Sequence, residues 1–257
     1  MGTNDPTKFI IGLTGNIGSG KSLVLKMLEQ KGAYIIDADA VSRRVMMKDA
    51  PAYQPVLDAF GRYILGADGE IDRPRLGRTV FGDPAALQML ESIVHPYVRQ
   101  AISTLVETHT GPEEVLVIEA IKLLEGPLKD LCDAIWVVTV PQETAIRRLQ
   151  KRGLPEAEAR QRMQAQGPDD AKLEAANLVI DNNGTPSDTW KQVSEAYNVI
   201  IEVRQRHAAM AAESPLRRYR PTEMEQLAEF INAAAGEEHA FVPVSYTHLT
   251  LPTILLV

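Results

Sequence analysis

Cysteine is nearly absent from this sequence, since Cys132 is the only one among 257 residues. A single cysteine cannot form an intrachain disulfide, and it cannot build a metal site that needs several thiolates. This excludes the small secreted proteins that depend on disulfides for stability. It is also what we expect of a protein that stays in the cytoplasm, where thiols are kept reduced.

Positive charge is also in short supply. The 27 Lys and Arg residues are outnumbered by 34 Asp and Glu, which gives a formal net charge of −7 at pH 7. Nucleic-acid binding depends mainly on Lys and Arg that neutralise phosphates, so we expect no nucleic-acid partner. Apolar residues make up 45% of the chain, a normal share for a folded globular protein. We expect a monomer or a weak homo-oligomer.

Long apolar runs are missing as well. The run at residues 9–13 is too short for the core of a signal peptide, and no stretch reaches the roughly 20 apolar residues of a membrane span. Met1-Gly2 would suit N-myristoylation, but Pro6 stands where that motif needs Ser or Thr. We therefore expect no membrane attachment.

Short apolar runs alternate with helical patterns along much of the chain. The runs near 115–118 and 135–140 are rich in β-branched residues, as is typical of strands covered on both faces of a parallel sheet. The alternation predicts an α/β fold, with three layers around a central parallel sheet. Strands are expected at residues 9–14, 33–36, 115–118, 135–140 and 178–180, and helices at 21–30, in two pieces at 142–166, and at 189–210.

These patterns also divide the chain. We predict a main domain at residues 1–212, with its core at 8–40 and 113–208, a helical insertion at about 41–112 and a basic helical lid at about 142–168. Residues 213–243 are interpreted as a linker and a lone helix that would fit the front of a truncated second domain. Residues 244–257 carry no charge and resemble translated sequencing-adapter read-through, so we interpret them as a non-native tail.

A glycine-rich motif follows the first expected strand. It matches the pattern Gly, four residues, Gly-Lys-Ser, between a strand and a helix, which is typical of a loop that binds nucleotide phosphates. Glycine is needed because the backbone N–H groups must turn toward phosphate oxygens, and the helix that follows adds its positive end. The expected nucleotide-binding residues are Gly15, Asn16, Ile17, Gly18, Ser19, Gly20, Lys21, Ser22 and Leu23.

Two members of this loop have expected chemical roles. Lys21 should reach the β- and γ-phosphates of ATP, and the Ser22 hydroxyl should coordinate Mg²⁺. The alternative is a glycine-rich turn with a surface lysine, which the flanking strand and helix disfavour.

Asp37 and Asp39 follow the second expected strand, and the carboxyl ends of parallel strands face the ligand crevice. We assign Asp39 the role of the base that accepts a proton from the acceptor hydroxyl, and Asp37 is a candidate partner of Mg²⁺. The alternative for either residue is a cap on the helix expected from Ala40.

Arg148 and Arg152 are four residues apart and lie on one helix face of the predicted lid. They are expected to neutralise triphosphate charge, with Arg148 acting in catalysis. The alternative is a solvated basic face that pairs with the nearby acids Glu143, Glu156 and Glu158.

The chain resembles the dephospho-CoA kinase family over residues 9–207, because several short motifs recur in that family's order and spacing. They are the phosphate-binding loop, Asp37-Ala38-Asp39, Asp68-Gly69, Arg73, Leu76, Phe81, His95-Pro96, Arg148, Arg152, Gln166 and Asp181-Asn182-Asn183-Gly184. The resemblance implies the fold of the P-loop NTPases and the last step of coenzyme A biosynthesis. In that step ATP phosphorylates the ribose 3′-hydroxyl of dephospho-CoA.

The same resemblance implies roles for individual residues. It makes Asp39 the base, and it makes Asp39, Arg73 and His95 contacts of the acceptor. For His95, the sequence leaves open the alternative that it is a packed or capping residue. The chain departs from the family pattern at Asn16, where a glycine is common, and near Lys122, a candidate phosphate contact.

Two other functions stay open at this stage. A nucleoside or nucleotide kinase would share the loop and the lid but not the features of the insertion. A nucleotide-dependent switch would need a guanine-specific Asn-Lys-x-Asp segment, which the sequence lacks.

Overall fold

The computed structural model describes residues 8–80, 82–109, 115–167 and 169–213. Its centre is a sheet of five parallel strands in the order β2-β3-β1-β4-β5. The strands are β1 (Phe9–Thr14), β2 (Tyr34–Asp37), β3 (Val115–Glu119), β4 (Ala134–Thr139) and β5 (Leu178–Asp181). All five lie within two residues of the segments expected from the sequence, which confirms the α/β fold with a central parallel sheet.

The register of the sheet places the functional segments at one edge. Leu13 of β1 is paired with Glu119 of β3, and Asp37 of β2 is paired with the same glutamate. On the other side Thr139 of β4 is paired with Asp181 of β5. Because the strands are parallel, their carboxyl ends and the turns that follow them meet at this edge.

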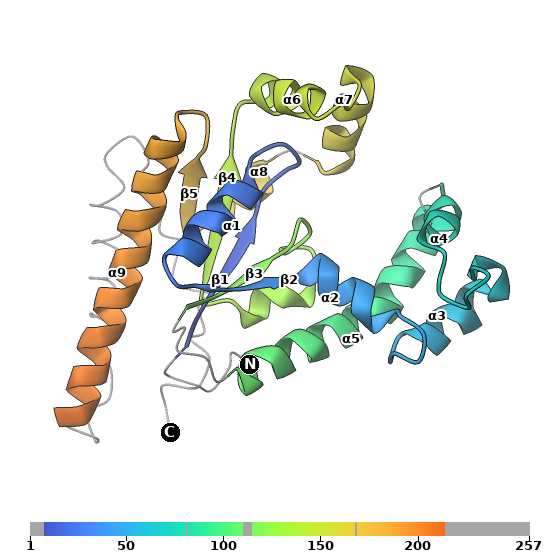
Figure 1. The fold of residues 1–257 in the computed structure, drawn as a ribbon, viewed down its shortest axis with the longest axis horizontal. Coiled ribbons are helices and arrows are strands. Elements are labelled where there is room, and N and C mark those ends of the chain that lie inside the picture. The colour runs from blue at the N-terminus through green and yellow to red at the C-terminus, as the bar shows by residue number, and fades with distance from the viewer. Residues whose placement is uncertain (1–7, 81, 110–114, 168, 214–257) are drawn as a thin grey trace.

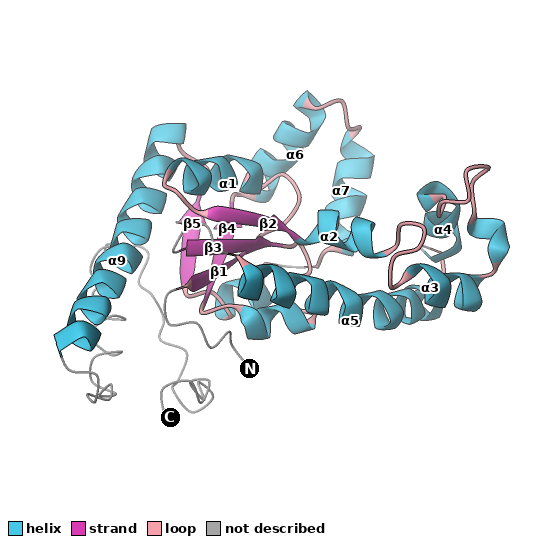
Figure 2. Cartoon of the chain, turned by 60° about the horizontal axis from the view of Figure 1, so that its bottom comes forward, coloured by secondary structure: helices cyan, strands magenta, loops and turns pink. Residues whose placement is uncertain are grey.

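Helices α1 (Lys21–Gln30) and α9 (Pro186–Glu213) cover one face of the sheet (Figures 1 and 2). Their apolar faces supply Val24, Leu28 and Val193 to a buried cluster with Ile11 and the other inward residues of that face. The alternation of side chains along β1 explains the division, since Ile11 and Leu13 face this cluster while Ile10 faces the opposite one.

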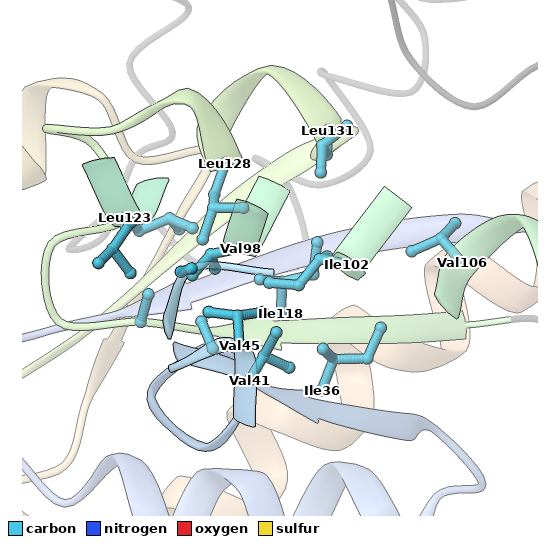
Figure 3. Packing of buried hydrophobic residues seen from close by; sticks show 14 of the residues in the cluster. Ile36, Val41, Val45, Val98, Ile102, Val106, Ile118, Leu123, Leu128 and Leu131 are labelled. Carbon is cyan, nitrogen blue, oxygen red and sulfur yellow. The ribbon is translucent and has the colours of Figure 1, made fainter. Parts of the chain in front are cut away.

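The opposite face is covered by α2 (Ala38–Val45) and the long helix α5 (Pro84–Thr108), as Figure 2 shows. Val41 of α2 and Ile102 of α5 pack against Ile118 of the sheet (Figure 3). Leu128, from the short 3₁₀ helix η2 (Pro127–Leu131), closes the same cluster. The sheet and its two helical covers make the three layers that were expected.

Three short helical pieces extend the α5 side away from the sheet (Figure 1). They are α3 (Tyr53–Phe60), the 3₁₀ helix η1 (Arg62–Ile64) and α4 (Arg73–Val80). Val56, Leu76 and Val80 pack into the cluster that α5 supports, so this arm shares the main core. The arm is helical as expected, while its limits as a domain at about 41–112 stay a prediction.

A helical hairpin lies at the carboxyl edge, above the first loop in Figure 1. It consists of α6 (Gln142–Lys151) and α7 (Glu156–Ala165), and the short helix α8 (Asp170–Glu174) follows. The break between α6 and α7 falls at Gly153, which has φ 87°, as the Gly-Leu-Pro sequence predicted. Residues 213–243 are interpreted as a linker with a lone helix and residues 244–257 as a non-native tail. From residue 214 on, both segments lie outside the described residues. No helix within the described part of the chain is long and apolar enough to span a membrane.

Candidate active site

The loop between β1 and α1 has a backbone conformation that requires glycine. Gly15 has φ 146° and Gly20 has φ 98°, a region that residues with a side chain rarely adopt. A β-carbon at Gly20 would also lie 2.0 Å from Asn182 Nδ2, and one at Gly15 would lie 2.3 Å from the carbonyl oxygen of Val138. The loop therefore packs directly on the end of β4 and on the turn after β5, at the start of α1.

Side chains from two neighbouring segments fasten this loop through the carbonyl oxygen of Ser19. Asn182 Nδ2 donates to that oxygen at 2.7 Å, and Arg148 Nη1 donates to it at 3.1 Å. Arg148 Nη2 donates to the carbonyl oxygen of Asn182 at 2.6 Å. The Asn182 side chain is itself held, because Thr189 Oγ1 donates to its Oδ1 at 2.9 Å. Arg148 thus connects α6 to both the loop and the turn after β5.

The acids that the alternative interpretation assigned to Arg148 have other partners. Glu143 and Glu156 form ion pairs with Arg160 at 3.2 and 2.9 Å. The Arg152 side chain is exposed and makes no hydrogen bond or ion pair within the described residues. The structure therefore brings Arg148 to the loop and leaves Arg152 outside it.

A second set of contacts joins the loop to the segment after α7, and the sequence did not predict it. Ile17 N donates to Gln166 Oε1 at 2.7 Å, and Asn16 Nδ2 donates to the carbonyl oxygen of Gly167 at 3.2 Å. Lys172 Nζ, from α8, donates to Asn16 Oδ1. The departure from the family pattern at Asn16 thus has a structural role, since both ends of its amide are used.

Charged groups lie close together beside the loop. Lys21 Nζ donates to the carbonyl oxygen of Gly15 at 2.8 Å and lies 3.9 Å from Glu119 Oε1. Burial lowers the pKa of Lys21, the Glu119 carboxylate opposes that change, and the Lys172 ammonium adds to it. Burial also raises the pKa of Glu119, while the charge of Lys21 acts in the opposite direction.

Glu119 is a site residue that sequence reasoning missed. The available signal was its position, because it ends a central strand at the same edge as the loop. Lys172 gave no comparable signal, since it lies on a five-residue helix in a segment with no recognisable motif.

The two aspartates after β2 have different environments. Asp37 Oδ1 accepts a 2.8 Å hydrogen bond from Ala40 N, and its carboxylate lies 3.6 Å from Arg43 Nη2. Asp37 is thus the N-cap of α2, and the helix begins at Ala38 rather than at the expected Ala40. Asp39 lies in the first turn of α2 with an exposed side chain. Its charge opposes the lowering of the Lys21 pKa by burial and adds to the raising of the Glu119 pKa by burial. Asp39 is therefore near enough to Lys21 and Glu119 to interact with them electrostatically.

The residues expected to contact the acceptor lie on the helices of the arm. Arg73 begins α4, and partial burial together with the nearby Arg43 guanidinium lowers the pKa of Arg73. His95 is half-buried on α5, and a β-carbon at Gly126 would lie 3.9 Å from its Nδ1. Neither side chain makes a hydrogen bond or ion pair with the loop within the described residues.

Lys122 has a protein partner of its own. Its Nζ donates to Glu91 Oε1 at 2.7 Å and lies 3.8 Å from Glu125 Oε2. The hydrogen bond with Glu91 raises the pKa of Lys122. The structure gives no support to a phosphate contact at this position.

The oxygen groups at this edge fit a magnesium ion bound together with a nucleotide. Ser22 lies in the first turn of α1, and Glu119 and Asp39 lie on the side of Lys21. Mg²⁺ prefers such hard oxygen ligands and usually keeps several waters and substrate phosphates around it. No group of three His, Cys, Asp or Glu side chains that could hold a metal alone occurs among the described residues. The donors thus suit an ion that arrives with its nucleotide.

Comparison with known proteins adds independent evidence. The sequence model of the family described as "Dephospho-CoA kinase" matches residues 9–188. The chain belongs to this family. The curated dephospho-CoA kinase of Moorella thermoacetica is 41% identical over 204 residues, covering 78% of this chain and 94% of that protein. The dephospho-CoA kinase of Arabidopsis thaliana is 39% identical over 197 residues, covering 76% of this chain and 84% of that protein.

Solved structures agree on the fold. A crystal structure from Thermus thermophilus has a TM-score of 0.64 and 32% identity, covering 76% of this chain and 97% of that one. The dephospho-CoA kinase from Campylobacter jejuni has a TM-score of 0.51 at 23% identity, which supports the fold alone. The resemblance to the dephospho-CoA kinase family that the sequence motifs indicated is confirmed by the family match and the curated relatives.

Proposed function

We propose that this protein transfers the γ-phosphoryl group of ATP to the ribose 3′-hydroxyl of dephospho-CoA and releases coenzyme A and ADP. The observation that carries the proposal is the family match over residues 9–188, in a chain whose loop keeps both Lys21 and Ser22 at the start of α1. The protein is therefore a phosphotransferase that acts on an alcohol group.

The side chains at the carboxyl edge divide the chemistry among themselves. The acceptor oxygen forms a bond to the γ-phosphorus while the bond to the β–γ bridging oxygen breaks, so ADP leaves. Asp39 accepts the proton that the hydroxyl loses. Lys21 neutralises charge on the β- and γ-phosphates, and Arg148 orders the loop that holds them.

A magnesium ion fits this reaction as the partner of ATP. Ser22 would hold it. Asp37 is the second candidate, and the same carboxylate also caps α2. The ion, when bound, neutralises charge on the β- and γ-phosphate oxygens. The support is the oxygen chemistry of Ser22, Glu119 and Asp39 at one edge of the sheet.

The acceptor belongs on the side of the arm. Arg73 of α4 and His95 of α5 are proposed to contact dephospho-CoA, and Arg152 is proposed to join Arg148 at the triphosphate. Arg73 lies near Arg43, so an anionic group of the acceptor would relieve the repulsion between the two guanidinium groups. The insertion at about 41–112 and the lid at about 142–168 are the proposed substrate-binding parts.

The setting of the reaction is proposed from composition. A single cysteine and a net charge of −7 support a cytoplasmic enzyme with small-molecule substrates and no nucleic-acid partner. We expect a monomer or a weak homo-oligomer, which sedimentation at several protein concentrations would test.

The function is tested by the identity of the product. The full chain is incubated with Mg²⁺, ATP and dephospho-CoA, and the product is examined by mass spectrometry and ³¹P NMR. The proposal expects a new phosphomonoester on the ribose of dephospho-CoA, and Lys21→Met serves as the inactive control. If nucleosides or nucleotides are phosphorylated while dephospho-CoA is not, the chain is a different kinase of the same fold.

A further inference from the structure

Lys172 is a buried ammonium group with few partners. Its residue is 6% exposed, although lysine is rarely buried without a paired charge. Within the described residues its only hydrogen-bond acceptor is Asn16 Oδ1, and it forms no ion pair. An ammonium has three N–H donors, so two of them have no protein acceptor here.

Burying a charge in this way is costly unless something compensates it. Burial raises the pKa of Asp169, and the charges of Lys172 and Lys21 act in the opposite direction, yet Asp169 forms no ion pair with either lysine within the described residues. One Asp169 oxygen, Oδ1, is itself buried without a hydrogen-bond partner. The protein therefore holds Lys172 in position without satisfying its charge.

The position of Lys172 identifies what would satisfy it. Lys172 donates a hydrogen bond to Asn16, the second residue of the phosphate-binding loop. Its charge adds to the lowering of the Lys21 pKa by burial. Lysine in this loop reaches the β- and γ-phosphates, so Lys172 stands at the same end of the nucleotide. Two ammonium groups that repel each other across the loop form a site for an oxygen-rich anion.

We infer that Lys172 is a second lysine ligand of the terminal phosphates of ATP, held in place by Asn16. This inference rests on the proposed function only in taking ATP as the nucleotide. It gives the segment after α7 a direct role in binding, since Gln166 and Gly167 fasten the same segment to the loop. Lys21 at the start of α1 and Lys172 on α8 would thus both bind the terminal phosphates.

Nucleotide titrations by calorimetry test the inference on the full chain with Mg²⁺. The probes are a non-hydrolysable ATP analogue with an imido β–γ bridge and AMP, which lacks the terminal phosphates. Lys172→Gln is the main variant, because it removes the charge and keeps an N–H donor for Asn16. Lys172→Met is the second variant, and Lys191→Met removes an exposed lysine of α9 as a control.

The inference expects Lys172→Gln to weaken binding of the ATP analogue by about tenfold or more, as for a lost charged contact, while AMP binding is unchanged. Lys172→Met should do the same, and Lys191→Met should match the unaltered chain. Asn16→Ala, which keeps the lysine charge, should lose less affinity than Lys172→Gln.

Other outcomes would overturn the inference. Unchanged affinity of Lys172→Gln for the ATP analogue would mean that the lysine does not touch the phosphates. An equal loss for AMP and the analogue in Lys172→Gln would show that Lys172 only shapes the loop. The binding assay contains no acceptor, so its result stands apart from any failure to phosphorylate dephospho-CoA.

Discussion

Asn182 donates its side-chain amide to the carbonyl oxygen of Ser19 at 2.7 Å, across 163 residues of sequence. The turn after the last strand thereby supports the phosphate-binding loop that follows the first strand. Since Asn182 also lies where a β-carbon on Gly20 would be, the two segments fit together with no spare room. The loop is shaped by its neighbours as much as by its own glycines.

Removing this support should destabilise the protein. Asn182→Ala removes one of the two side-chain donors to the Ser19 carbonyl, which keeps Arg148, and removes the better acceptor of the Thr189 hydroxyl. We expect a loss of about 1–3 kcal/mol in the free energy of unfolding, measured by urea denaturation, with weaker ATP binding. Asn183→Ala is the matched control, because the Asn183 side chain is exposed and, within the described part of the chain, accepts a hydrogen bond only from Thr144 Oγ1 at 3.0 Å. Equal stability of the two variants would contradict this role for Asn182.

The two lid arginines should behave differently. Arg148→Ala removes a partly buried guanidinium contact with the loop and with the turn after β5, so we expect a loss of about 1.5–3 kcal/mol of stability. Arg152→Ala should leave the melting temperature unchanged, because its side chain is exposed. Its effect, if it contacts ATP, should appear only in the kinetics of turnover. Equal melting temperatures for the two variants would be the contrary result.

The two aspartates after β2 should separate in the same way. Asp39→Asn should lower kcat by about 10²–10⁴-fold, as for the loss of a general base, with little change in the KM for ATP. Asp37→Asn should lower kcat much less, because asparagine also caps helices well. Steady-state kinetics with dephospho-CoA would measure both. If Asp37→Asn proves as damaging as Asp39→Asn, the base assignment loses its support.

Cys132 should resist thiol reagents in the folded protein. Its side chain donates a weak hydrogen bond to the carbonyl oxygen of Leu128 at 3.4 Å, and burial raises the pKa of its thiol strongly. The reactive thiolate is therefore scarce at neutral pH. We expect slow alkylation by iodoacetamide in buffer and rapid, complete alkylation in denaturant. Rapid labelling of the folded chain would show that the region around η2 opens easily.

Much of the fold followed from local patterns. The run 115–118 was recognised as a central strand because it is apolar throughout, and the structure buries it between two helical layers. The phosphate-binding loop was also found from a local pattern, since its glycines, its lysine and its flanking elements are adjacent in sequence. Helix ends were less exact, and α2 begins two residues earlier than expected because Asp37 caps it.

The contacts that complete the site were beyond sequence reasoning. Lys172 meets Asn16 across 156 residues, and Arg148 meets Ser19 across 129. Such pairs depend on which turns share an edge of the sheet, and that is decided by the strand order. Residue patterns along the chain do not contain that order.

The central claim is that dephospho-CoA is the acceptor, and acceptor-dependent release of ADP tests it most directly. The full chain is supplied with Mg²⁺ and ATP, and ADP is followed by a coupled assay with dephospho-CoA, adenosine or AMP added, with Asp39→Asn as a parallel sample. We predict turnover that rises far above acceptor-free hydrolysis only with dephospho-CoA and is lost in Asp39→Asn. Binding of ATP without any acceleration by dephospho-CoA would contradict the claim.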